Sequence, residues 1–270
     1  MEFIKSIEKV WSTNNSLVCV GLDPNMEKLP GHLQDAEYPL FEFNKSIVDS
    51  TADLVCAYKP QFAYYAAEGA ESQLSMTIDY IHERYPDILV ILDAKRGDIG
   101  STASMYAREV FDRFKADAAT VNPFLGGDSL APFLDRNDKG VIILCRTSNP
   151  GARDIQDLEI HGKKLYEVIA AKAAGAWNYN NNVLLVVGAT YPKELSEIRS
   201  IVGEMPLLVP GVGAQGADIE AAVVNGKNSR GSGMIINSSR AIIYAGSSTD
   251  FAEAARGATQ TLRQEINRYR

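Results

Sequence analysis

Charged residues of both signs alternate in one short segment, Asp93-Ala94-Lys95-Arg96-Gly97-Asp98, which directly follows the apolar run Ile88–Leu92. Because side chains alternate between two faces along a strand, Asp93 and Lys95 are expected to point the same way. Buried ions cost several kcal/mol each unless all of them are paired, so such a cluster is a poor device for stability alone. The segment therefore favours a site of acid–base chemistry, with a structural ion-pair network as the alternative.

A second lysine is expected in the same space. Lys59 follows the neighbouring apolar run, and Asp98 lies just past the strand, where Gly97 permits a sharp bend. Two lysines and two aspartates form a nearly self-neutralising array. Such an array suits a carboxylate substrate that loses CO₂, because an aspartate can face the reacting carboxylate while a lysine stabilises and protonates the carbanion left behind.

A glycine-rich segment, Pro210–Gly216, follows a later apolar run and could bind phosphate. Glycines let backbone N–H groups approach an anion, and Gln215 could donate to the anion or to a base. Arg240, just beyond the last apolar run, would offer a permanent charge and paired donors to phosphate oxygens. A tight connection without a ligand is the alternative, but the pairing with Arg240 favours phosphate.

Three further segments leave two interpretations each. Thr147–Gly151 supplies hydroxyl and amide groups that could bind a polar ring, or it forms an ordinary turn. Asp23 could bind a sugar hydroxyl, or it forms an Asx turn before Pro24. The glycine-containing, basic loop Asn225–Gly233 could be a lid or a solvated loop.

The elements that must position these residues follow from eight short apolar runs. The runs are mostly unbroken rather than alternating, which is typical of parallel strands covered on both faces. Eight strand–helix units in 270 residues favour a closed (β/α)₈ TIM barrel over an open doubly wound sheet. In such barrels the chemistry lies at the carboxyl ends of the strands, where the polar clusters stand. The runs are Leu17–Leu22, Leu54–Tyr58, Ile88–Leu92, Ala118–Val121, Val141–Cys145, Val183–Val187, Leu207–Val209 and Met234–Ile236, and helical patterns cover Asn44–Asp53, Ala70–Arg84, Thr102–Phe114, Gly162–Trp177, Pro192–Val202 and Asp250–Tyr269.

The composition is that of an ordinary globular chain, with 46% hydrophobic and 23% charged residues. No linker or low-complexity tract divides it, so a single barrel domain over residues 1–270 is expected. The formal charge of −7 argues against binding to nucleic acid or to an anionic membrane. The longest clear apolar stretch, Val183–Ala189, is far too short to span a bilayer, and the N-terminus lacks the apolar core of a signal peptide. Three separated cysteines without a C-x-x-C motif indicate buried, reduced thiols, and we expect a cytoplasmic protein.

Metal and nucleophile motifs are missing from the sequence. His32, His82 and His161 are scattered, and no H-x-H or H-E-x-x-H spacing occurs. There is no G-x-S-x-G elbow, no G-x-G-x-x-G after the first run and no G-x-x-x-x-G-K-[ST] loop. We therefore expect neither a metal nor a cofactor.

The D-x-K-x-x-D segment at Asp93–Asp98 and the Thr-Ser-Asn-Pro-Gly loop at Thr147–Gly151 together resemble the orotidine 5′-phosphate decarboxylase family, in its second, slightly longer subgroup. The resemblance covers Leu17–Ala245. It implies decarboxylation of orotidine monophosphate to uridine monophosphate, the final step of de novo pyrimidine synthesis, without cofactor or metal.

The resemblance also implies roles for the charged residues. Lys95 would donate the proton to the pyrimidine carbon, Asp93 would stand beside the departing carboxylate, and Lys59 would complete the array and contact the ribose. Asp98 and Thr102 would reach into the site of a neighbouring subunit, which implies a homodimer with composite sites.

The binding residues follow in the same way. Asp23 would bind a ribose hydroxyl, Ser148 the pyrimidine edge, and Gln215 and Arg240 the phosphate. Ser239 stands where many members of the family have glycine, but only a backbone N–H is needed there. Whether Thr147 or Ser148 contacts the pyrimidine stays open.

Two other functions remain as alternatives. One is a related phosphosugar decarboxylase or aldolase that holds Mg²⁺ with acidic residues, but Gln61 stands two residues after Lys59 and Glu68 is the one acid nearby. The other is a non-catalytic protein that binds a phosphate ligand.

Overall fold

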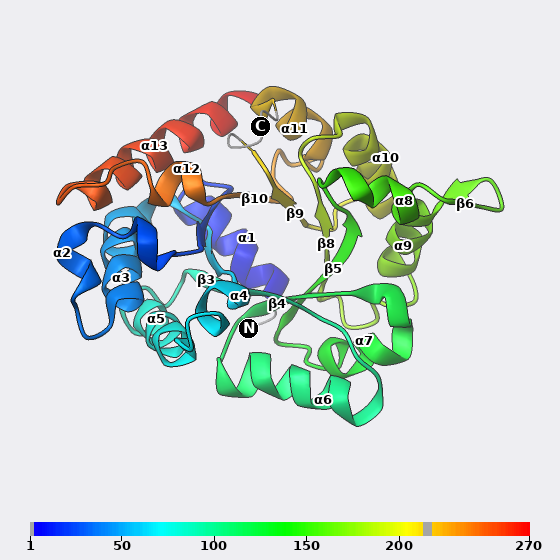
Figure 1. Ribbon diagram of the computed structural model, residues 1–270. Helices are drawn as coiled ribbons and strands as arrows, with labels where there is room; N and C mark the ends of the chain where they lie inside the picture. Colours follow the sequence, from blue (N-terminus) through cyan, green and yellow to red (C-terminus); the bar gives the residue numbers. More distant parts are fainter. Residues whose placement is uncertain (1–2, 213–217) are drawn as a thin grey trace.

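Eight parallel strands close into a barrel, and helices surround it (Figure 1). The structure is a computed structural model that describes residues 3–212 and 218–270. Neighbouring strands follow the order of the chain and the last pairs with the first, which confirms the predicted closed (β/α)₈ barrel. The barrel strands are β1 (Val18–Leu22), β2 (Ala57–Pro60), β3 (Leu89–Arg96), β4 (Ala118–Val121), β5 (Gly140–Arg146), β8 (Val183–Val187), β9 (Leu207–Pro210) and β10 (Met234–Ser238).

Each predicted apolar run overlaps one of these strands. Nearly every strand residue is buried, because helices cover the outer face of the barrel and side chains fill its interior. The second run was placed too early, since residues 52–54 form a 3₁₀ turn and β2 begins at Ala57.

The longer helices match the predicted patterns with shifted starts. The region expected to begin at Thr102 begins at Gly100, whose positive φ of 55° turns the chain out of β3. The helices are α1 (Phe3–Thr13), α2 (Gly31–Gln34), α3 (Pro39–Thr51), α4 (Phe62–Ala66), α5 (Glu71–Arg84), α6 (Gly100–Arg108), α7 (Gly127–Leu134), α8 (Arg153–Gln156), α9 (Leu165–Ala174), α10 (Pro192–Val202), α11 (Ile219–Gly226), α12 (Arg240–Ile243) and α13 (Phe251–Tyr269).

One unpredicted feature concerns the region before α9. A two-stranded hairpin, β6 (Glu159–Ile160) and β7 (Lys163–Lys164), projects from the barrel wall before α9 (Figure 1). The predicted helix start at Gly162 is therefore wrong, because His161 and Gly162 both adopt positive φ and turn the hairpin.

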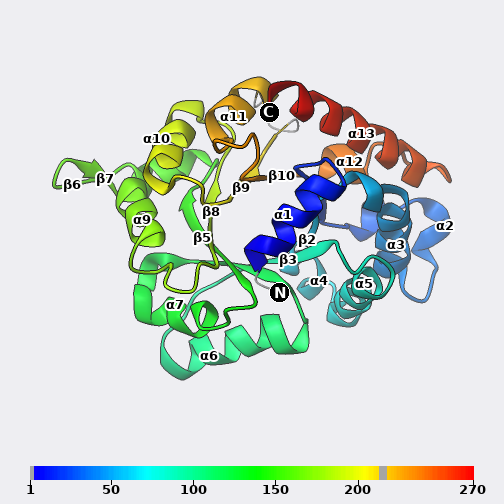
Figure 2. The same cartoon turned by 180° about the vertical axis from the view of Figure 1, so that it is seen from behind.

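Helix α1 covers the amino-terminal end of the barrel, as the view from behind shows (Figure 2). Its buried face consists of Phe3, Ile7, Val10 and Trp11. The first turn packs tightly on the strands, because a Cβ atom at Gly140 would stand 2.8 Å from the Phe3 ring. The amino-terminal end is thus closed, and ligand access is left to the opposite end.

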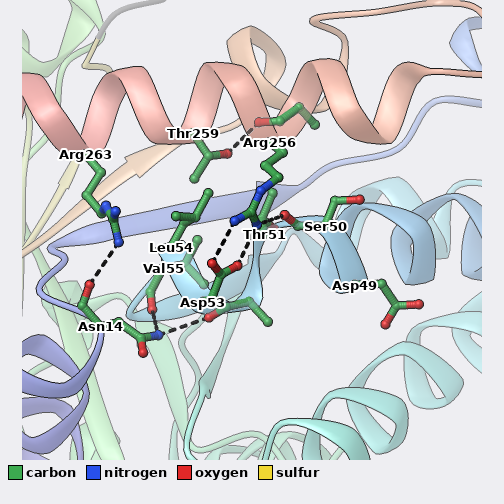
Figure 3. Close-up of polar contacts among 12 residues, drawn as sticks. Asn14, Asp49, Ser50, Thr51, Asp53, Leu54, Val55, Arg256, Thr259 and Arg263 are labelled. Atoms are coloured by element: carbon green, nitrogen blue, oxygen red, sulfur yellow. Dashed lines mark hydrogen bonds and ion pairs between the residues drawn. The ribbon is translucent and has the colours of Figure 1, made fainter.

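Helix α13 ties the last strand–helix unit to the first (Figure 3). Arg256 donates to both carboxylate oxygens of Asp53 and to the carbonyl of Ser50, at 2.6 to 2.8 Å. Farther along the helix, Arg263 donates to the carbonyl of Asn14. These contacts support barrel closure from outside.

The loop Asn225–Gly233 is not a lid. It connects α11 to β10 at the amino-terminal end of the barrel, away from the carboxyl ends of the strands. Arg199 of α10 donates to the carbonyls of Gly226 and Gly233, and Arg230 pairs with Glu8 of α1. The glycines and basic residues in this loop serve packing against neighbouring elements.

Two other expectations can be compared with the structure. Cys19, Cys56 and Cys145 are free and buried, as predicted. Within residues 3–212 and 218–270, no helix combines the length and the apolar character that crossing a membrane requires.

Candidate active site

A cavity of about 880 Å³ opens at the carboxyl ends of the strands, a size typical of small-molecule sites. Most of the barrel strands contribute lining residues to it. Those that bear on the predicted chemistry are Asp23, Lys59, Asp93, Lys95, Thr120, Thr147, Ser148, Asn237, Ser239 and Arg240. The cavity therefore contains the lysines and the aspartate Asp93 of the predicted charged cluster, together with residues predicted to bind the other parts of a ligand.

Asp93 lies at the centre of the charged cluster between two ammonium groups. Lys59 Nζ donates to Asp93 Oδ2 at 2.9 Å, and Lys95 Nζ donates to Asp93 Oδ1 at 2.6 Å. Lys59 and Asp93 are buried, whereas 46% of the Lys95 side chain is exposed to the cavity and solvent. The more accessible lysine is thus the one predicted to donate a proton.

The interactions within the cluster shift the pKa values of Asp93 and Lys59 so that both groups stay charged. Burial by itself would raise the pKa of Asp93, but Lys59 and Lys95 outweigh burial and hold that pKa well below its usual value. Burial would likewise lower the pKa of Lys59, but Asp93 and then Asp23 raise it above its usual value. Both groups therefore stay ionised across the physiological range.

Thr120 joins the cluster, and the sequence reasoning missed it. Its hydroxyl donates to Asp93 Oδ1 at 2.9 Å and accepts the backbone N–H of Lys95 at 2.9 Å. Lys95 itself has a positive φ of 47°, uncommon for a residue other than glycine. The available signal was a lone hydroxyl near the end of the otherwise apolar strand β4.

The segment after β5 contains both candidates for contact with a pyrimidine, Thr147 and Ser148, and their surroundings differ. The Thr147 hydroxyl donates to Asn149 Oδ1 at 2.7 Å and accepts from Gln156 Nε2 at 3.0 Å, so its bonds are made within the segment. Gln156 also accepts the backbone N–H of Thr147. Ser148 lines the cavity, and its backbone packs against Gly188, where a Cβ atom would stand 2.9 Å from it. The geometry favours Ser148 as the residue that faces a ligand.

The predicted ribose and phosphate residues lie around the same cavity. Asp23 makes no Asx turn, and its buried Oδ1 has no hydrogen-bond partner among residues 3–212 and 218–270. Ser239 and Arg240 follow β10, and Gly21 makes room for Ser239, since a Cβ atom there would overlap the serine hydroxyl. Gln215 lies outside the described residues.

Asp98 and Thr102 do not line the cavity of their own chain. Asp98 is half-buried and accepts the backbone N–H of Ile99, while Thr102 is exposed near the start of α6. The segment is anchored by Arg96, which forms a two-pronged ion pair with Glu109 at 2.8 and 3.0 Å. Both predicted residues therefore lie outside the cavity of their own chain, close to a segment that this ion pair fixes.

In the described part of the chain, no three His, Cys, Asp or Glu side chains gather closely enough to hold a metal ion.

A (β/α)₈ barrel with an aspartate between two lysines in its carboxyl-end cavity defines an enzyme of acid–base type. The sequence model of the "Orotidine 5'-phosphate decarboxylase / HUMPS family" matches residues 16–256. The chain belongs to this family. Orotidine 5′-phosphate decarboxylases of Ralstonia nicotianae and Dechloromonas aromatica are 57% and 58% identical to it over 270 residues, the full length of each chain. The solved structure of Leishmania donovani OMP decarboxylase matches with a TM-score of 0.87 at 38% identity and covers 100% of this chain and 99% of that one.

Proposed function

We propose that this protein is a carboxy-lyase that converts orotidine 5′-monophosphate to uridine 5′-monophosphate and CO₂ in pyrimidine biosynthesis. The observation that carries the proposal is the buried aspartate held between two lysines in the barrel cavity. The alternative functions are not favoured, because relatives that match the whole chain carry the decarboxylase name.

The chemistry follows from the charge arrangement. The substrate carboxylate is placed beside Asp93, whose lowered pKa keeps it ionised. As the C–CO₂ bond breaks, its electron pair stays on the pyrimidine carbon, and CO₂ leaves. The Lys95 ammonium stabilises this carbanion and then transfers a proton to the same carbon. Because the positive charge is already in place, little reorganisation is required during the step.

The remaining lining residues would hold the nucleotide. Lys59 and Asp23 would contact the ribose, Ser148 the pyrimidine edge, and Arg240 would offer paired donors to the phosphate; all four residues line the cavity. Gln215 and the backbone N–H of Ser239 complete the proposed phosphate site. Remote phosphate contacts supply binding energy that is used at the reacting carbon.

We propose further that the protein is a homodimer in which Asp98 and Thr102 complete the site of the partner. Two large apolar side chains close to these residues in the sequence are exposed, Ile99 by 59% and Met105 by 57%. Exposed apolar side chains that gather on one surface mark protein–protein contacts. For location we propose the cytoplasm, which three free, buried thiols support.

The decisive experiment follows orotidine monophosphate by ultraviolet absorbance with purified wild-type protein and the Lys95→Ala variant, with and without a chelator. We expect turnover that the chelator does not change, and a loss of nearly all turnover in the variant while uridine monophosphate still binds. No turnover by the wild type, or turnover that stops with chelator, would overturn the proposal in favour of the alternatives.

A further inference from the structure

The hydroxyl of Thr120 lies between Asp93 and Lys95 and forms a hydrogen bond with each of them. Thr120 is 1% exposed and lies in β4. A threonine hydroxyl has one proton, which goes to Asp93 Oδ1, so a lone pair accepts the N–H of Lys95. Both contacts depend on one oxygen atom, and neither can be made by a methyl group.

The hydrogen bond from the Lys95 N–H to the Thr120 hydroxyl stabilises an uncommon backbone conformation at Lys95. The pairing of β3 with β4 shifts register between Leu92 and Arg96, so Lys95 falls in an irregular stretch. There the hydroxyl of a neighbouring strand takes the place of a carbonyl acceptor. Left-handed φ values persist in residues other than glycine only where the surroundings enforce them. The Thr120 contact is one such enforcement, and it fixes the direction in which the Lys95 side chain leaves the strand.

The hydrogen-bond donors around Asp93 are distributed over its two carboxylate oxygens. Oδ1 accepts from Thr120 and Lys95, whereas Oδ2 accepts from Lys59. Each lysine therefore faces a different oxygen, and the hydroxyl resists rotation of the carboxylate plane. A small misplacement of the groups around a reacting carbon lowers the rate steeply.

We infer that Thr120 is a positioning residue for the decarboxylation, acting through Asp93 and Lys95 rather than on the substrate. This inference rests on the proposed function. It predicts that loss of the hydroxyl lowers the rate of the chemical step and leaves nucleotide binding nearly intact, because the ribose, pyrimidine and phosphate contacts come from other strands.

The test compares Thr120→Val, which removes the hydroxyl at similar shape, with Thr120→Ser, which keeps it. We expect kcat to fall about 10- to 100-fold in T120V and to stay within about threefold of wild type in T120S. The dissociation constant for uridine monophosphate, measured by calorimetry, should stay within about threefold in both variants. Thr259→Val is the matched control, because Thr259 is equally buried but donates only to Ala255 within α13, remote from the cavity (Figure 3).

Three results would overturn the inference: wild-type kcat in T120V, equal losses in T120S and T120V, or a loss of nucleotide affinity that matches the loss of kcat. Should T120V not fold, Thr120→Ala against Thr120→Ser still isolates the hydroxyl. An inactive wild type would contradict the proposed function itself, whereas an active wild type with an equally active T120V would contradict only the role of Thr120.

Discussion

Asp93 is the residue on which the charge arrangement depends. It is the shared partner of Lys59 and Lys95, so its removal leaves the buried Lys59 without its closest counter-charge. Breaking a buried pair in this way is strongly destabilising, because an uncompensated charge remains in the interior. The same residue thus serves both the stability of the barrel mouth and the proposed chemistry.

The lowered pKa of Asp93 has a defined effect on stability. Between its folded and unfolded pKa values the unfolded chain binds more protons, so this contribution is complete above about pH 4 and is lost as the pH falls below that value. Asp93→Asn removes the titration. We expect the variant to be less stable at pH 6, with a gap that narrows towards pH 2.5 by up to about 1.4 kcal/mol per pH unit.

Urea unfolding across this pH range measures the gap. Asp87→Asn serves as the control, because that carboxylate is exposed and its pairing with Lys9 lies at the surface. A gap between wild type and Asp93→Asn that stays constant with pH would contradict the assignment.

At the scale of elements, the regular parts were predictable and the irregular parts were not. The barrel strands are unbroken apolar runs, which few other structures require. Helix α1 was not predicted, although its buried residues Phe3, Ile7, Val10 and Trp11 have helical spacing. The register shift in β3 left no such pattern. The register shift depends on a contact with Thr120 in another strand. The spacing of residues within one segment cannot reveal a contact with a distant segment.

Arg199 joins several elements at the amino-terminal end of the barrel. It donates to the carbonyls of Gly203, Met205, Gly226 and Gly233, and burial lowers its pKa to about 10. Arg199→Met removes the donor from all four carbonyls, but Gly233 keeps the N–H of Leu207 and the Gly203 contact is exposed to water. The carbonyls of Met205 and Gly226 are therefore the buried acceptors left unpaired. We expect a loss of at least about 2 kcal/mol in the free energy of unfolding, because each buried acceptor left alone costs about 1–3 kcal/mol.

The cavity lies at the other end of the barrel, so kcat of the folded Arg199→Met variant should match wild type. Chemical denaturation and the decarboxylation assay measure the two effects. Lys193→Met is the control on the same helix, since Lys193 is exposed and its change should stay within about 0.5 kcal/mol. Equal stability of both variants would show that the carbonyl contacts contribute nothing.

At the scale of the molecule, sequence spacing predicted which residues of one chain meet, but not which face outward. Lys59, Asp93 and Lys95 could be brought together by the barrel rule alone, since each stands at the carboxyl end of a strand. Asp98 stands three residues after Lys95, yet it lies outside that cavity. Its proposed role came from the family resemblance and depends on a second chain, which spacing within one chain cannot reveal.

The composite-site proposal predicts complementation between two inactive variants. Lys95→Ala inactivates a site through its own chain, whereas Asp98→Ala inactivates the site of the partner. In a mixed dimer one site carries both changes and the other carries neither. Random exchange of subunits should therefore restore about a quarter of wild-type activity, since half of the dimers are mixed and each has one intact site.

The control mixes Lys95→Ala with Lys59→Ala, which both affect sites through their own chain, so the mixture should stay inactive. Dissociation and reassociation of equal amounts, followed by the absorbance assay, measures the recovery. An Asp98→Ala mixture that stays inactive would place Asp98 in the site of its own chain, whereas an Asp98→Ala variant that is active by itself would place Asp98 outside any site.

Helix α1 and the final turn of α13 both lie at the closed end of the barrel, where Lys227 Nζ contacts the carbonyl of Tyr269. An affinity tag, a surface linker or another folded domain attached at either end would therefore extend away from the open mouth. Immobilised and fused forms should keep free diffusion of small molecules into and out of the barrel.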